Sequence, residues 1–170
     1  LWTMLYPTAV PRTLRWLCGF LVIVPAWLAL DWLYRLNSLY LLLVLTVVWA
    51  ADIGAYFSGK RFGRLKLAPQ ISPGKTWEGV LGGLIAVTAL TAAHSLWSGI
   101  GLITLIPLCL AVGIISIVGD LTVSIFKRSA GVKDSGSLFP GHGGVLDRAD
   151  SITAAAPLFA LGLGWIGVGT

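Results

Sequence analysis

Charged residues are scarce in this chain, and their scarcity argues against a soluble globular protein. Asp, Glu, Lys and Arg make up only 11% of the 170 residues, about half the share found in an average soluble domain. Apolar residues make up 56%, enough for about five membrane spans of roughly 20 residues each. Because little chain remains for a soluble domain, the net charge of +5 does not indicate a nucleic-acid partner.

Cysteine is also rare, which argues against a zinc centre. Cys18 and Cys109 lie far apart inside apolar runs, without the Cys-x-x-Cys or Cys/His spacing of a metal site. We expect both to be packing residues. The chain begins at a leucine and shows no signal peptide, so we expect that further N-terminal transmembrane segments are missing from it.

The apolar runs predict an all-α fold, a polytopic helical bundle embedded in the membrane as one domain over residues 1–170. We expect about five transmembrane helices, at residues 14–30, 39–57, 80–96, 100–126 and 152–168. The fourth run is ~40 Å long at ~1.5 Å per residue, so it must protrude from the bilayer or bend, at Pro107 or Gly113. The GVLGG sequence that opens the third run predicts close helix contact.

Two polar segments, residues 58–79 and 127–151, separate these runs and are expected to be cytoplasmic loops that form the functional site. If the five spans alternate in direction, all of the 12 Lys and Arg residues except Arg35 fall on one side of the membrane. The positive-inside rule makes that side cytoplasmic.

Four aspartates stand at the ends of apolar runs, where a charge needs a partner. Asp52 and Asp120 lie within predicted helices, and their partners could be Lys or Arg side chains or a metal ion. Asp147 and Asp150 are three residues apart and would share a helix face. The alternative for this pair is a structural role as N-terminal helix charges, with Ser151 as an N-cap.

Residues 124–150 concentrate basic side chains, carboxylates and glycines, a composition that suits phosphate and a hard cation such as Mg²⁺. An ordinary solvated basic loop is the alternative. His142 lies in a glycine-rich turn, where it could bind metal, contact phosphate or simply occupy the turn. Lys75, in SPGKT, is a plausible phosphate contact although the full P-loop spacing is absent.

These residues resemble the signature of phosphatidate cytidylyltransferases, also called CDP-diacylglycerol synthases. The resemblance rests on SIFKRSAGVKDSGSLFPGHGGVLDRAD at residues 124–150, with ADIGAYFSGKRFG and LAPQISPGKTWEG upstream, so it covers the chain from about residue 50 onward. Ala149 stands where a larger aliphatic residue is usual, and Ile53 where a small polar residue is common.

The resemblance implies transfer of CMP from CTP to phosphatidate, giving CDP-diacylglycerol and pyrophosphate, with Mg²⁺ required and room for a second cation such as K⁺. It implies Asp120 and Asp147 as metal ligands, followed by Asp150 and Asp52. The catalytic residues expected beside these aspartates are Lys127, Arg128 and His142. The residues expected to bind substrate are Lys75, Ser124, Lys133, Gly143, Gly144 and Arg148.

The expected partners are CTP, phosphatidate and membrane lipids, and the expected location is a bacterial inner membrane. A homodimer is left open. Two other functions remain as alternatives. A CTP-dependent polyprenol or lipid kinase would transfer the γ-phosphate instead of CMP, and a cation or proton transporter would use its intramembrane aspartates to line an ion path.

Overall fold

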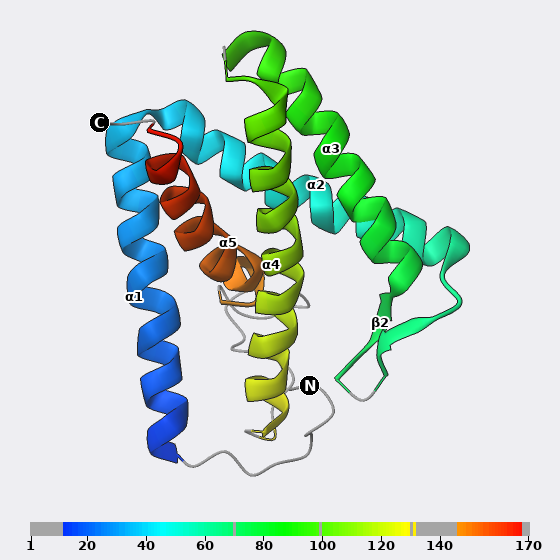
Figure 1. Cartoon of the computed structure of the whole chain (residues 1–170). Helices are drawn as coiled ribbons and strands as arrows, with labels where there is room; N and C mark the ends of the chain where they lie inside the picture. The colour runs from blue at the N-terminus through cyan, green and yellow to red at the C-terminus, as the bar shows by residue number, and fades with distance from the viewer. Residues whose placement is uncertain (1–11, 70, 99, 130, 132–145, 168–170) are drawn as a thin grey trace.

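The structure, a computed structural model, describes residues 12–69, 71–98, 100–129, 131 and 146–167. Five helices and one β-hairpin make up this part of the chain (Figure 1). In chain order they are α1 (Arg12–Leu36), α2 (Ser38–Phe62), β1 (Lys66–Ala68), β2 (Ser72–Thr76), α3 (Trp77–Ser98), α4 (Leu102–Ser129) and α5 (Leu146–Trp165).

The five helices confirm the predicted helical membrane bundle. Within the described ranges, α1 to α4 are long and apolar enough to cross a membrane. Asn37 alone separates α1 from α2, and its side chain accepts a hydrogen bond of 2.9 Å from the Leu39 amide, which caps α2. The helix α4 runs without interruption through Pro107, as one element of 28 residues.

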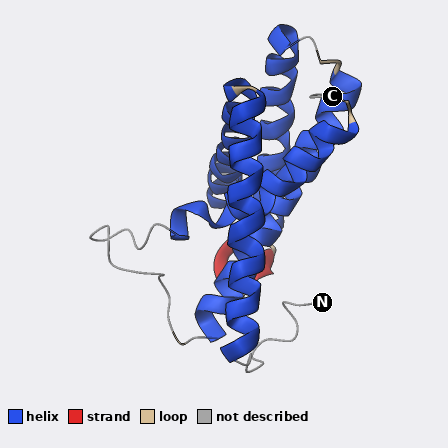
Figure 2. Cartoon of the chain, turned by 90° about the vertical axis from the view of Figure 1, so that its left-hand side faces the viewer, coloured by secondary structure: helices blue, strands red, loops and turns tan. Residues whose placement is uncertain are grey.

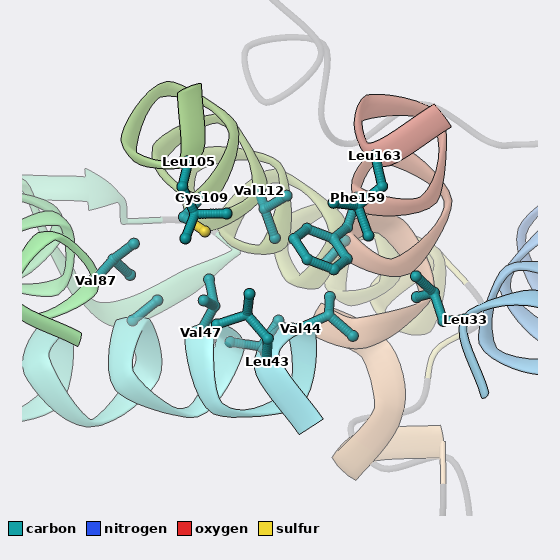
Figure 3. Close-up of a cluster of buried hydrophobic side chains, with 13 residues drawn as sticks. Leu33, Leu43, Val44, Val47, Val87, Leu105, Cys109, Val112, Phe159 and Leu163 are labelled. Atoms are coloured by element: carbon teal, nitrogen blue, oxygen red, sulfur yellow. The ribbon is translucent and has the colours of Figure 1, made fainter. Parts of the chain in front are cut away.

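The helices pack around a large apolar core, which draws mainly on α2, α4 and α5 (Figure 3). Phe159 of α5 is completely buried among Val44 of α2 and Val112 of α4. Cys109 belongs to the same core, which confirms its predicted role in packing. This core holds α2, α4 and α5 in a fixed arrangement, and each of these helices carries one aspartate of the candidate site.

Small residues allow α2 and α3 to pack closely, as the GVLGG sequence predicts. A Cβ atom on Gly82 of α3 would lie 1.8 Å from the Ser58 hydroxyl oxygen of α2. No side chain fits there, so the contact requires glycine. The α2–α3 pair forms the base from which the hairpin projects (Figure 1).

The sequence did not predict the hairpin, which lies inside the polar segment at residues 58–79. β1 and β2 pair antiparallel, with Lys66 opposite Thr76 and Ala68 opposite Ser72. Ala68 and Ile71 pack against Leu121 of α4, together with Ile125. In Figure 2 the strands, coloured red, are seen behind the helices.

Both polar segments are shorter as loops than predicted, because the helices extend into them. α2 continues to Phe62 and α3 begins at Trp77, while α4 continues to Ser129 and α5 begins at Leu146. Polar residues near both ends of these segments therefore lie in helical turns beyond the apolar runs.

Candidate active site

Three aspartates from three different helices come together at one end of the bundle. Asp52 is on α2, Asp120 on α4 and Asp150 on α5. The carboxyl groups of Asp120 and Asp150 lie within hydrogen-bonding reach of each other, and Asp52 is close enough to Asp120 for their charges to repel. The Ser151 side chain, next to Asp150 in the chain, lies close to the Asp52 carboxylate. We call Asp52, Asp120 and Asp150 the aspartate trio.

Two lysines from different elements neutralise part of this charge. The Lys75 ammonium, on β2, forms an ion pair with the Asp120 carboxylate. The Lys127 ammonium, on α4, lies 3.5 Å from the Asp150 carboxylate, and both of these side chains are largely buried. The Ser124 hydroxyl lies one turn from Asp120 and donates a long hydrogen bond of 3.5 Å to its carboxylate. The trio thus has the cationic partners that intramembrane aspartates need.

The hairpin sets the position of Lys75 through hydrogen bonds at the start of α3. The Thr76 hydroxyl accepts a hydrogen bond of 3.1 Å from the Gly79 amide, which caps the helix. The Leu65 carbonyl accepts a hydrogen bond of 3.0 Å from the Trp77 amide. The Leu65 amide donates to the Glu78 carboxylate at 3.2 Å. These bonds tie both ends of the hairpin to α3, so its lysines have a defined place.

A glycine sets the distance between Asp120 and Asp150. A Cβ atom on Gly119 of α4 would lie 2.5 Å from the Ala154 Cβ atom of α5, closer than two carbon atoms can approach. Because Gly119 precedes Asp120 and Ala154 lies one turn after Asp150, the close approach of the two helices also brings the two carboxyl groups together.

The carboxyl groups are electrostatically suited to a cation. Burial raises the pKa of Asp150 above its ordinary value, and the adjacent Asp120 carboxylate raises it further. A divalent cation between them would relieve this repulsion. Among the described side chains, no three of His, Cys, Asp or Glu are grouped closely enough to hold a metal ion. Mg²⁺ commonly takes only one or two protein carboxylates and completes its shell with water and phosphate oxygens, so the Asp120–Asp150 pair fits it.

A polar cavity of about 520 Å³, which we call the lysine cavity, opens beside the aspartate trio. Its walls come from α2, the hairpin, the start of α3 and Ile117 of α4. Three lysines line it, Lys60 on α2, Lys66 on β1 and Lys75 on β2, and Asp52 is its one acidic residue among the described side chains. A cavity of this size is in the range of small-molecule sites, and its charge favours an anion with several negative groups.

The structure places seven of the predicted site residues. It brings Asp52, Lys75, Asp120, Ser124, Lys127 and Asp150 together, and it places Arg128 half-buried in the last turn of α4. Asp147 and Arg148 lie in the first turn of α5, but the description of this turn covers their backbone and not their side chains. The remaining predicted residues, Lys133, His142, Gly143 and Gly144, lie outside the described residues.

The sequence analysis missed Lys60 and Lys66 as site residues. Helical spacing could have found Lys60, because Asp52, Tyr56 and Lys60 follow at i, i+4 and i+8 along α2 and therefore share one face. All three line the lysine cavity, and the Lys60 ammonium lies 5.7 Å from the centre of the Tyr56 ring. Lys66 could not have been found in this way, because its place depends on the pairing of the hairpin.

The fold and the site define a polytopic helical membrane protein with an aspartate and lysine cluster at one end of its bundle. Residues 2–165 match the cytidylyltransferase family, and the chain belongs to this family.

Several bacterial relatives are similar over most of this chain. It is 51% identical over 147 residues to the phosphatidate cytidylyltransferase of Pseudomonas aeruginosa, an alignment that covers 84% of this chain and 54% of that protein. The enzyme of the same name from Haemophilus influenzae is 54% identical over 131 residues, covering 73% of this chain and 46% of the relative. The Synechocystis enzyme is 52% identical over 120 residues, an alignment that covers 69% of this chain and 40% of the relative. The chain thus spans about half the length of the curated relatives it matches.

Proposed function

We propose that the protein transfers CMP from CTP to phosphatidate, producing CDP-diacylglycerol and pyrophosphate. The observation that carries the proposal is the position of Asp120, paired with Lys75 of the lysine cavity on one side and adjacent to Asp150 on the other. This arrangement can hold a polyphosphate next to carboxylates that favour a cation. Family membership and the names of the bacterial relatives support the same reaction.

In the proposed reaction, a phosphate oxygen of phosphatidate attacks the α-phosphorus of CTP. The new phosphorus–oxygen bond joins the two phosphates, and the bond from the α-phosphorus to the bridging oxygen of the β-phosphate breaks, so pyrophosphate leaves with that electron pair. A phosphate monoester has a second pKa of ~6, so its oxygen is already anionic at neutral pH and no strong general base is needed. The main task of the protein is to bring two anions together and stabilise the charge of the leaving group.

The lysines that the structure describes would bind the phosphates of both substrates. Lys60, Lys66 and Lys75 would bind the triphosphate in the lysine cavity. Lys127 and Arg128, at the end of α4, would bind the phosphate of the lipid, and Ser124 would hold the Asp120 carboxylate in place. We also assign substrate contacts to Lys133, Arg148 and the turn formed by His142, Gly143 and Gly144, on the basis of their places in the family's signature.

Asp120 and Asp150 would bind Mg²⁺ together with Asp147, and Asp52 would support them from α2. When bound, Mg²⁺ would neutralise phosphate charge and favour departure of pyrophosphate. A second cation such as K⁺ is part of the same proposal, on the basis of the resemblance to the family's signature. We place the site at the cytoplasmic face of a bacterial inner membrane, in agreement with the distribution of lysines and arginines.

The test is incubation of the purified protein, expressed from its complete reading frame, with phosphatidate and CTP labelled either in the cytosine or at the γ-phosphate. The expected products are a lipid that carries the cytosine label and labelled pyrophosphate, with activity lost in EDTA and restored by Mg²⁺. A lipid that carries the γ-phosphate label, with CDP released, would identify a lipid kinase instead. Full activity in metal-free buffer would refute the role of Mg²⁺.

A further inference from the structure

A second cavity lies on the other side of α4 from the lysine cavity. It has a volume of about 460 Å³ and is formed by α1, α4 and α5. We call it the apolar groove. Its α5 lining consists of Thr153, Ala154 and Pro157, near the middle of that helix, and the rest of its lining comes from α1 and α4. Figure 1 shows α5 between α1 and α4. Val22, Ile23, Val118 and Phe126 are among the side chains that line it.

The groove offers no unused hydrogen-bonding hydroxyl to a ligand among its described residues. Its hydroxyl groups belong to Thr122 and Thr153, and each donates a hydrogen bond of 2.8 Å to a carbonyl of its own helix, that of Val118 and that of Asp150 respectively. The remaining lining side chains are aliphatic or aromatic, apart from the Cys18 thiol. Because a polar ligand would lose its hydration without gaining partners, the groove selects an apolar one.

The length and direction of the groove fit one leaflet of a bilayer. Its α4 wall extends from Ile115 to Phe126, a rise of about 17 Å, close to half of the ~30 Å hydrocarbon core. Phe126 directly precedes Lys127 and Arg128, so the groove ends at the cationic end of α4. One end is therefore suited to an anionic headgroup and the rest to hydrocarbon.

We propose that the apolar groove binds one acyl chain of phosphatidate, with the chain along α4 and the phosphate at the Phe126 end beside Lys127. This inference rests on the proposed function and adds the place of the lipid. It puts the lipid and the nucleotide on opposite sides of α4, where their phosphates meet at the aspartate trio. The chain's methyl end would lie near Val118 and Ile115, about 12 Å or more from Phe126 along the helix.

The groove can be blocked at its deep end. Val118 has 48% of its surface exposed and faces the groove, so Val118→Trp fills the space without displacing the core. Ile23→Trp blocks the groove independently from the α1 wall. Ile85 on α3 is exposed and lines neither cavity, so Ile85→Trp is the matched control.

The first measurement uses phosphatidate with a photoactivatable diazirine near the methyl end of one chain, in phosphatidylcholine vesicles that contain the protein. We expect crosslinks on α4 near residues 115–118 and on α1, competed by unlabelled phosphatidate and lost in Val118→Trp and Ile23→Trp but kept in Ile85→Trp. Crosslinks spread equally over the outer faces of α2 and α3 would overturn the proposal, because they would indicate ordinary surrounding lipid.

The second measurement compares two substrates, dioleoyl and dihexanoyl phosphatidate. Blocking the deep end should lower kcat/KM for the long-chain lipid about tenfold, the effect of removing about two methylenes from an apolar site, and leave the short-chain lipid unchanged. Equal losses with both lipids, or no loss with either, would overturn the proposal. If the unmodified protein forms no cytosine-labelled lipid from either substrate, the proposed function fails, and the crosslinks alone decide whether phosphatidate occupies the groove.

Discussion

The two cavities beside α4 are similar in volume, about 520 and about 460 Å³, and opposite in chemistry. The lysine cavity is lined by three lysines and several glycines, whereas the apolar groove is lined almost entirely by hydrocarbon. Successive residues of α4 line different cavities: Ile117 lines the lysine cavity, whereas Val118 and Gly119 line the apolar groove. Under the two proposals above, one helix would separate the site of a water-soluble polyanion from the site of a lipid chain.

In the proposed reaction, this difference would let the protein bring together two substrates that dissolve in different phases. Asp120 follows Gly119 on the dividing helix and reaches Lys75 of the lysine cavity. Asp150, on α5, is adjacent to Asp120 and paired with Lys127. In the proposed reaction, the two phosphates would meet at the aspartate trio while the nucleotide stays in the lysine cavity and the acyl chain in the apolar groove.

The largest loss of activity is expected from substitution of Asp120, which lies between the lysine cavity and the apolar groove. Asp120→Asn removes a carboxylate charge from the proposed cation site and breaks the ion pair with Lys75, so we expect turnover to fall by at least about a hundredfold. Asp147→Asn should cause a comparable loss. The measurement is formation of cytosine-labelled lipid.

The matched control for this prediction is Asp31→Asn, which removes the same charge from an exposed pair with Arg35 at the other end of the bundle. It should leave activity unchanged. Near-normal turnover in Asp120→Asn, in protein that elutes as folded material from a gel-filtration column, would remove this residue from the proposed cation site.

A smaller effect, confined to the nucleotide side, is expected of Lys60→Ala. Losing one cation from the lysine cavity should raise the KM for CTP about tenfold and leave the KM for phosphatidate unchanged. Arg61 is the next residue and does not line this cavity, so Arg61→Ala controls for the loss of positive charge at the same end of α2. Equal effects of the two substitutions on the KM for CTP would mean that only the overall charge matters.

Gly119→Ala should disturb the apolar groove, because Gly119 lies at the contact between α4 and α5. The added Cβ atom would force α4 and α5 apart at Ala154, at a cost of about 1–3 kcal/mol in the free energy of unfolding. We expect a lower melting temperature in detergent and a several-fold higher KM for phosphatidate. Gly164→Ala on α5 is the control, since a Cβ atom there meets no other atom within 4 Å. A melting temperature for Gly119→Ala equal to that of the control would contradict the assigned helix contact.

The smallest effect is expected at the base of the hairpin. Glu78→Ala removes the carboxylate that accepts the Leu65 amide, so the hairpin lysines should be held less firmly. Since this bond is at the surface, we expect only about a twofold to threefold rise in the KM for CTP. Glu78→Gln keeps an oxygen acceptor and should remain close to the unmodified protein. A loss as large as that of Lys60→Ala would show that Glu78 acts in binding itself.

The helical part of the fold could be predicted because its cause is local. Long apolar runs must form helices in a membrane, and the GVLGG sequence correctly indicated a close helix contact, which α3 makes with α2. The hairpin could not be predicted, because its strands have only three and five residues and include Pro73 and Gly74, which disfavour strands. What stabilises it is the packing of Ala68 and Ile71 on α4, a tertiary contact.

Part of the candidate site could also be predicted from local sequence. Asp52, Asp120 and Asp150 stand out because a charge at the end of an apolar helix needs a partner. Their adjacency depends on the packing of α2, α4 and α5 around the core, which no local pattern contains. Lys66 was missed because it reaches the lysine cavity only through the hairpin, and the apolar groove was missed because its residues look like ordinary membrane-facing side chains.

The most direct test of the division of the two substrates by α4 is steady-state kinetics of Lys60→Ala and Val118→Trp with both substrates varied. The account predicts opposite outcomes. Lys60→Ala should raise the KM for CTP alone, and Val118→Trp should raise the KM for long-chain phosphatidate alone. Variants that each alter both constants to the same extent, or that exchange these roles, would contradict it.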